Sequence, residues 1–138
     1  MARILAIDYG GKRTGIAVTD PLQIIATGLE TVPTQDLVPH LQKLLLKEKV
    51  EKIVLGMPYK LDGSDTDTTQ PVLNLQKKLE TSFPTVLIVL WDEQFSSKKA
   101  MQAMIQGGVS KKDRRDKALI DKVSATIILQ DYLASNSL

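Results

Sequence analysis

Asp8 is the first residue of this sequence whose position indicates chemistry. It closes an apolar run, residues 4–7, with the composition of a strand covered on both faces. Burying a carboxylate there is costly unless a cation or hydrogen-bond donors compensate its charge. The turn that follows, residues 9–15, contains glycines that allow close backbone approach, and it carries Lys12 and Arg13, whose charges suit phosphate oxygens. The start of the chain therefore predicts an acid beside a phosphate-binding turn.

Two further carboxylates occupy comparable positions. Glu93 follows soon after the most apolar predicted strand, residues 85–91, and Asp121 lies on the apolar face of a predicted last helix, residues 117–133. One compact fold could bring these two acids to Asp8. Carboxylate oxygens suit Mg²⁺ or Mn²⁺, and two such ions can promote hydrolysis of a phosphodiester without histidine or cysteine. A metal-dependent nuclease is therefore one hypothesis.

Each carboxylate also has an ordinary structural explanation. Asp8 could accept hydrogen bonds from the amides of the glycine turn, and Asp121 could be an acid in the first turn of a helix. Glu93 could pair with Lys98 or cap the following helix. Because three acids spread along a chain are common, their spacing alone does not define a metal site.

Composition excludes several other kinds of site. The chain has no cysteine, which removes disulfides and thiolate chemistry, and a serine–histidine triad would have to use His40, the only histidine. His40 falls in a helical pattern rich in lysine and leucine, where a surface histidine is expected. With 138 residues, 43% of them hydrophobic, and no repeat or linker, the chain is expected to form a single domain over residues 1–138.

The charge distribution points weakly to a polyanionic partner. Residues 98–122 contain eight basic and three acidic residues, among them Arg114 and Arg115, although the whole chain is only +2. An ordinary solvated surface would explain the same excess. Aromatic residues make up 4% of the chain, which disfavours binding through base-stacking platforms and favours backbone contacts. No leader pattern or membrane-length apolar run is present, so we expect a cytoplasmic protein without a membrane partner.

The order of the predicted elements indicates an α/β fold with a mixed sheet. Strands are predicted at residues 4–7, 15–20, 23–32, 53–56 and 85–91. Helices are predicted at residues 35–49 with Thr34 as N-cap, at 71–81, up to residue 105 with Ser96 or Ser97 as cap, and at 117–133. Short connections imply a three-strand antiparallel meander, and right-handed crossovers then add two parallel strands with helices on both faces.

Four motifs together make the sequence similar to a known family. They are DYGGKRTGIAVTD at the start, IVLGMPYKLDGS, DEQFSS, and IDKVSATIILQDYL in the last helix. They resemble the YqgF family, ribonuclease H-like proteins described as Holliday junction resolvases and as pre-16S ribosomal RNA nucleases. The resemblance covers nearly the whole chain, and it implies a ribonuclease H-like fold in which Asp8, Glu93 and Asp121 match the acidic catalytic positions that bind Mg²⁺ or Mn²⁺.

The chain departs from the family pattern in two places. Gln94 stands where the family usually has arginine, which removes a cation that could touch phosphate. Lys122 and Val123 replace small residues after the helix acid. The resemblance also implies that the strand at residues 53–56 lies between the strands that precede Asp8 and Glu93. Glu93 would then have to reach back across that strand, and Asp62 or Asp65 could take its place.

The resulting prediction is a hydrolase that processes precursor 16S ribosomal RNA. Its predicted phosphate contacts are Lys12, Arg13, Arg114 and Arg115. The alternatives are a resolvase acting on branched DNA and a non-catalytic nucleic-acid-binding module of ribosome assembly. A nucleotide-binding ATPase is a further alternative, because residues 8–15 also resemble a phosphate loop after a first strand. The ribosome is a candidate partner, and the sequence leaves the oligomeric state open.

Overall fold

A computed structural model of the chain describes residues 2–57, 69–92 and 117–136. Within these ranges five strands form one sheet in the order β3-β2-β1-β4-β5. The strands are β1 (Arg3–Tyr9), β2 (Arg13–Thr19), β3 (Ala26–Pro33), β4 (Val50–Met57) and β5 (Leu87–Asp92). The pairs β1–β2 and β2–β3 are antiparallel, whereas β1–β4 and β4–β5 are parallel. The predicted meander with two added parallel strands is confirmed.

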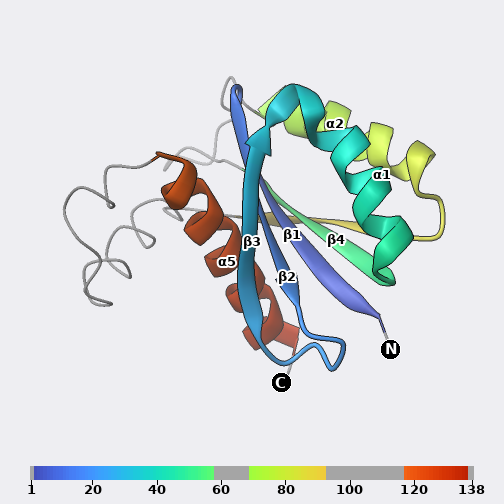
Figure 1. Cartoon of the computed structure of the whole chain (residues 1–138), viewed down its shortest axis with the longest axis vertical. Helices are drawn as coiled ribbons and strands as arrows, with labels where there is room; N and C mark the ends of the chain where they lie inside the picture. Colours follow the sequence, from blue (N-terminus) through green and yellow to red (C-terminus); the bar gives the residue numbers. More distant parts are fainter. Residues whose placement is uncertain (1, 58–68, 93–116, 137–138) are drawn as a thin grey trace.

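Helices cover both faces of the sheet, as predicted (Figure 1). One face carries α1 (Leu37–Lys47), which follows the 3-10 turn η1 (Thr34–Asp36), and α2 (Thr69–Ser82). The other face carries α5 (Lys117–Asn136), which packs mainly on β2, β3 and β1. The predicted helix ending at residue 105 lies outside the described residues.

Strand β1 divides its side chains between the two cores by strict alternation. Leu5 and Ile7 are buried under α1 and α2, whereas Ile4 and Ala6 are buried under α5. Asp8 continues the alternation toward α5, and Tyr9 packs against the core beneath α1 and α2. The strand therefore delivers an acid and an aromatic ring to opposite faces at the same end of the sheet.

Helix α5 is fixed on the sheet by an apolar and aromatic face. Ala125, Ile128 and Tyr132 are buried there, as the helical spacing predicted. The ring of Tyr132 meets Trp91 of β5 edge-to-face, with centroids 5.3 Å apart. Because Trp91 is the only tryptophan of the chain, its fluorescence reports on the docking of α5.

The start of α1 differs from the prediction. Thr34 is not the N-cap: it begins η1, and α1 begins three residues later with Asp36 at the N-cap position, whose side chain makes no capping hydrogen bond. The hydroxyl of Thr34 instead donates a hydrogen bond to the carbonyl oxygen of Gly10, in the turn before β2, at 2.6 Å. Local sequence favours a cap at such a threonine, but the turn before β2 competes for the same hydroxyl group.

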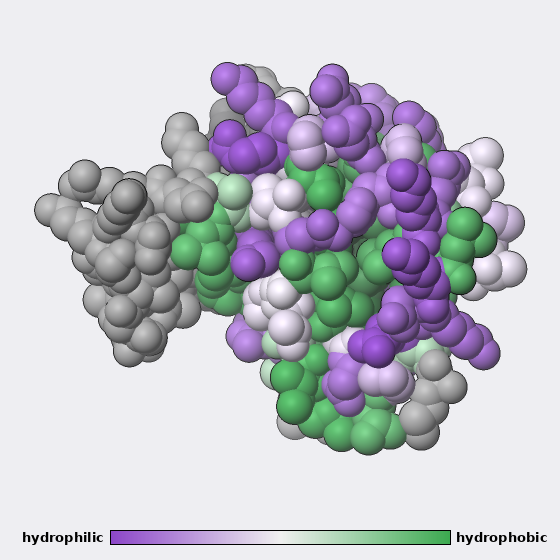
Figure 2. Space-filling model, in the orientation of Figure 1, coloured by the Kyte–Doolittle hydropathy of each residue, from purple (hydrophilic) through white to green (hydrophobic). Residues whose placement is uncertain are grey.

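The β2–β3 turn lies at the end of the sheet opposite Asp8. Its centre is held by Asp20, whose carboxylate accepts hydrogen bonds from the backbone N–H groups of Leu22, Ile24 and Ile25. The side chains of Leu22, Ile24 and Ile25 are exposed, and Figure 2 shows hydrophobic atoms gathered at this lower end of the molecule. Among the helices in the described ranges, none is long and apolar enough to span a membrane.

Candidate active site

The parallel strands β1, β4 and β5 all end at one edge of the sheet, which we call the carboxyl edge. Ile7 of β1 pairs with Leu55 of β4, and two residues further along β4 Met57 pairs with Asp92, the last residue of β5. Asp8 is half-buried at the carboxyl edge, one residue before β1 ends. The sheet register therefore brings the ends of all three strands close to Asp8.

The beginning of α5 lies directly over β2 beside Asp8. Gly15 is the antiparallel partner of Asp8, and a Cβ atom on Gly15 would come within 2.0 Å of the carbonyl oxygen of Asp121. The hydroxyl of Thr31 on β3 also donates to the carbonyl of Ala118 at 2.5 Å. Because directly opposed residues on two strands share a face, Asp8 and Asp121 lie on the same side of the sheet at its carboxyl edge, as predicted.

Arg13 is joined to Asp121 by an ion pair. Its Nε atom donates to Oδ2 of Asp121 at 3.1 Å, and the two side chains are 39% and 24% exposed. In the described part of the chain, no other side chain accepts a hydrogen bond from the guanidinium of Arg13. Lys12 is exposed in the turn before β2. Both predicted phosphate ligands therefore belong to the turn that follows Asp8, and Arg13 already contacts a predicted metal ligand.

Two threonines hold the glycine turn in place, and sequence reasoning missed their role. The backbone N–H of Thr34 donates to Lys12 O at 2.9 Å, and its hydroxyl donates to Gly10 O. Thr14 Oγ1 lies 2.9 Å from Thr34 Oγ1. Because the single hydroxyl hydrogen of Thr34 goes to Gly10, Thr14 is the donor between them. The buried Thr14 hydroxyl and the end of β3 therefore fix the turn that carries Lys12 and Arg13.

The remaining predicted site residues lie outside the described residues. These are Glu93, Gln94, Arg114, Arg115, and the alternative ligands Asp62 and Asp65. Glu93 directly follows Asp92, with which β5 ends at the carboxyl edge. In residues 2–57, 69–92 and 117–136 no three acidic or histidine side chains are close enough together to hold a metal ion. A site with three carboxylates would need a ligand from outside these ranges.

The amino ends of the described α-helices also face the carboxyl edge. Helix α1 follows Pro33, which pairs with Arg13, and the first turns of α5 lie on Gly15. Helix α2 places Pro71 in a cavity that Tyr9 also lines. Since the amino end of a helix carries partial positive charge, this edge favours an anionic ligand such as phosphate despite its carboxylates.

Solved structures with the same topology identify the fold. One described as "T. thermophilus RuvC in complex with Holliday junction substrate" covers 99% of this chain and 96% of its own, with a TM-score of 0.59 and 17% sequence identity. Another, described as "Thermus thermophilus RuvC structure", covers 98% and 96%, with a TM-score of 0.55 and 15% identity. The protein is thus a ribonuclease H-like α/β domain with carboxylates from its first strand and last helix at one edge.

Sequence relatives assign the chain to a family. A family profile described as "RuvX: Holliday junction resolvase" matches residues 2–135, and the chain belongs to this family. A protein of Phocaeicola vulgatus named "Putative pre-16S rRNA nuclease" is 50% identical over 135 residues, covering 98% of this chain and 97% of the relative. One of Flavobacterium johnsoniae with the same name is 48% identical over 135 residues, covering 98% of each chain. The resemblance found in the sequence motifs is confirmed, and the class of enzyme is nuclease.

Proposed function

We propose that this protein is a divalent-metal-dependent nuclease whose substrate is the precursor of 16S ribosomal RNA. The observation that carries the proposal is the placement of Asp8 beside the first turns of α5 and Asp121, next to a turn bearing Lys12 and Arg13. The names of the relatives favour ribosomal RNA as substrate. The description of the family profile favours branched DNA as the second candidate.

The donor set at the carboxyl edge suits a hard divalent cation. Asp8 and Asp121 offer only oxygen ligands, and Oδ2 of Asp121 already faces the guanidinium cation of Arg13. We assign both acids as ligands of Mg²⁺ or Mn²⁺, and Glu93 as the third ligand. When bound, two such ions supply activation of a water molecule and stabilisation of the leaving oxygen.

The basic residues around this edge would orient the substrate. Lys12 is exposed in the turn, and Arg13 can offer phosphate the guanidinium nitrogens that do not contact Asp121. We assign Arg114 and Arg115 as further phosphate contacts. The threonine contacts on the turn would keep Lys12 and Arg13 in position without touching substrate.

Cleavage assays with two substrates test the proposal. Purified protein is incubated with labelled precursor 16S ribosomal RNA and with a labelled four-way DNA junction, each with and without Mn²⁺. We expect metal-dependent cleavage of the RNA, its loss in Asp8→Asn and in Asp121→Asn, and Trp91 fluorescence melts that show both variants to be folded. Asp131→Asn is the matched control, because Asp131 is an exposed acid at the far end of the same helix as Asp121.

The other outcomes separate the alternatives. Cleavage of the junction alone would identify a resolvase. Metal-independent RNA binding with no cleavage of either substrate would identify the non-catalytic assembly module. Hydrolysis of ATP without cleavage of nucleic acid would replace the nuclease with the ATPase hypothesis.

A further inference from the structure

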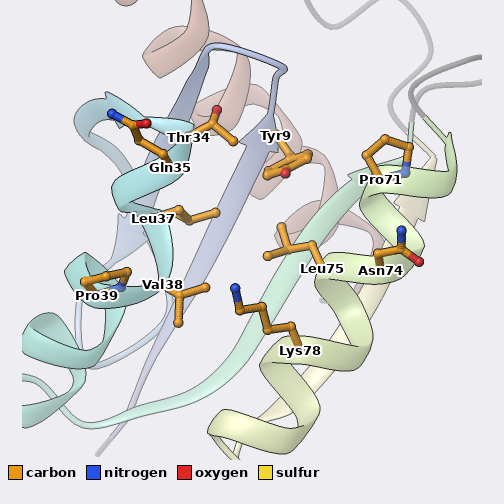
Figure 3. Close-up of a pocket in the computed structure, with 10 residues that line it drawn as sticks. All are labelled: Tyr9, Thr34, Gln35, Leu37, Val38, Pro39, Pro71, Asn74, Leu75 and Lys78. Atoms are coloured by element: carbon orange, nitrogen blue, oxygen red, sulfur yellow. The ribbon is translucent and has the colours of Figure 1, made fainter.

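A cavity of about 400 Å³ lies between α1 and α2, on the face of the sheet opposite α5 (Figure 3). Its inner wall is apolar, formed by Leu37 and Leu75, which are buried, together with Tyr9. Asn74 and Lys78 of α2 line its exposed side, and Figure 3 shows the amino group of Lys78 directed into the space between the two helices. The volume is within the range of sites that hold a small organic ligand.

The cavity adjoins the carboxyl edge through Tyr9. Tyr9 directly follows Asp8 on β1, so the two side chains leave neighbouring backbone positions toward opposite faces of the sheet. Within the described part of the chain, the phenol oxygen of Tyr9 has no hydrogen-bond partner, and the residue is only partly buried. An extended strand that placed one phosphate near Asp8 could therefore turn its neighbouring base toward Tyr9.

The chemistry of the lining suits a nucleotide better than an apolar ligand. Tyr9 provides an aromatic ring for stacking, and the amide nitrogen of Asn74 can donate a hydrogen bond, while its oxygen already accepts one from Gln70 at 3.0 Å. Lys78 is the only cationic residue of the described lining, which contains no carboxylate. The amino ends of α1 and α2 flank the cavity and add partial positive charge. A base, a sugar and one phosphate would each meet a complementary group.

We propose that this cavity binds a single nucleotide of the substrate strand next to the cleaved phosphodiester, with its base against Tyr9 and its phosphate at Lys78. The assignment rests on the proposed nuclease function and extends it to a subsite on the other face of the sheet. It gives the enzyme a requirement for an unpaired nucleotide beside the cleavage site, because a base within a duplex could not enter the cavity.

Binding without turnover tests the subsite separately from catalysis. The probe is a single-stranded oligouridylate carrying one 2-aminopurine, titrated with the full chain in EDTA so that no cleavage occurs. We expect the 2-aminopurine fluorescence to be quenched on binding, because the base stacks on an aromatic ring. Tyr9→Leu should weaken binding about fivefold or more and reduce the quenching, whereas Tyr9→Phe should retain both.

Lys78 has a matched control on the same helix. Lys78→Ala should lower the slope of log binding constant against log salt concentration by about 0.7, the value for one phosphate contact to a single strand. Lys77→Ala should leave the slope unchanged, because Lys77 is also exposed on α2 but does not line the cavity. Melts followed by Trp91 fluorescence establish that each variant is folded.

Three results would overturn the subsite. If Tyr9→Leu and Lys78→Ala both bind the probe with wild-type affinity and quenching, the subsite is rejected, whether or not the protein cleaves RNA. An equal decrease of the salt-dependence slope in Lys77→Ala and Lys78→Ala would mean that both lysines contribute only general electrostatic attraction and that the subsite does not exist. Displacement of the probe by adenosine monophosphate with an affinity equal to that of the RNA would make it a site for free nucleotides. Conversely, normal quenching by a protein that cleaves neither substrate would retain the subsite and reject the nuclease.

Discussion

The Nε atom of Arg13 lies 3.1 Å from Oδ2 of Asp121, although the two residues are 108 positions apart in the chain. The contact links the glycine turn before β2 to the first turns of α5. It also means that the carboxylate assigned to metal is held by a protein cation before any metal arrives. A divalent ion bound by Asp121 would therefore have to compete with Arg13 for the same oxygen atom.

Arg13→Ala should separate these two roles of the ion pair. Without metal, the variant should lose about 0.5–1 kcal/mol of unfolding free energy, as is usual for a partly exposed pair. With Mn²⁺ its melting temperature should rise more than that of the wild type, because no guanidinium has to be displaced from Asp121. Melts followed by Trp91 fluorescence across a Mn²⁺ titration measure both effects.

Asp121→Asn provides the control for this competition. This substitution removes the negative charge to which both Arg13 and the metal would bind. The melting temperature of the variant should therefore respond weakly to Mn²⁺. The double variant Arg13→Ala/Asp121→Asn should respond no more than Asp121→Asn alone. A metal response in Arg13→Ala equal to or below that of the wild type would mean that Arg13 and the metal do not share Asp121.

Gly15→Ala should displace the beginning of α5. The added methyl group would come within 2.0 Å of the Asp121 carbonyl, a backbone atom that cannot rotate away. We expect the free energy of unfolding to fall by about 1–3 kcal/mol, and the melting temperature to rise less on addition of Mn²⁺. Gly11→Ala is the matched control: nothing lies within 4 Å of its added Cβ atom. A similar loss in both variants would point to the flexibility of the turn rather than to helix packing.

Thr34→Val should loosen the glycine turn while preserving side-chain shape. Gly10 O loses its donor and the buried Thr14 hydroxyl loses its acceptor, which should cost about 1–3 kcal/mol. Thr81→Val is the control, since its hydroxyl also donates to a backbone carbonyl, that of Lys77, but on an exposed helix end. Urea unfolding measures the difference, and equal, small effects in both variants would exclude an anchoring role for Thr34.

Asp20→Ala should reveal a pH-dependent contribution from the β2–β3 turn. The backbone N–H of Ile25, followed by those of Ile24 and Leu22, holds the pKa of the Asp20 carboxyl below its ordinary value of 3.8. The stabilisation is therefore fully present above that value and is lost as the pH falls through the lower folded-state pKa. We expect the wild type to melt higher than Asp20→Ala at neutral pH and the difference to vanish in acid. A difference independent of pH would refute the electrostatic origin.

The division of β1 between the two cores and the face of Asp121 could be predicted because both depend on local periodicity. A period of two divides β1 between the two cores, and a spacing of three and four residues puts Asp121 on the same face as Ala125 and Ile128. Short connections also specify the meander. These features need no knowledge of which distant segment packs on which.

The contacts of Thr34 and Arg13 could not be predicted in this way. A threonine before a helix has the same local signature whether it caps that helix or reaches back to Gly10, and the choice depends on the register of β2 against β3. Arg13 beside glycines resembles a phosphate ligand, and its pairing with Asp121 appears only once α5 docks on β2. Tertiary placement decides both cases.

The alternation of β1 makes the site far less tolerant of changes in chain length than of substitutions. Deleting one residue within β1 would shift every following side chain to the other face. Tyr9 would then point at α5, and the charge of Asp8 would be forced into the core beneath α1 and α2. Evolution or engineering can exchange individual side chains along this strand, but a single-codon insertion or deletion there should abolish the fold and the site together.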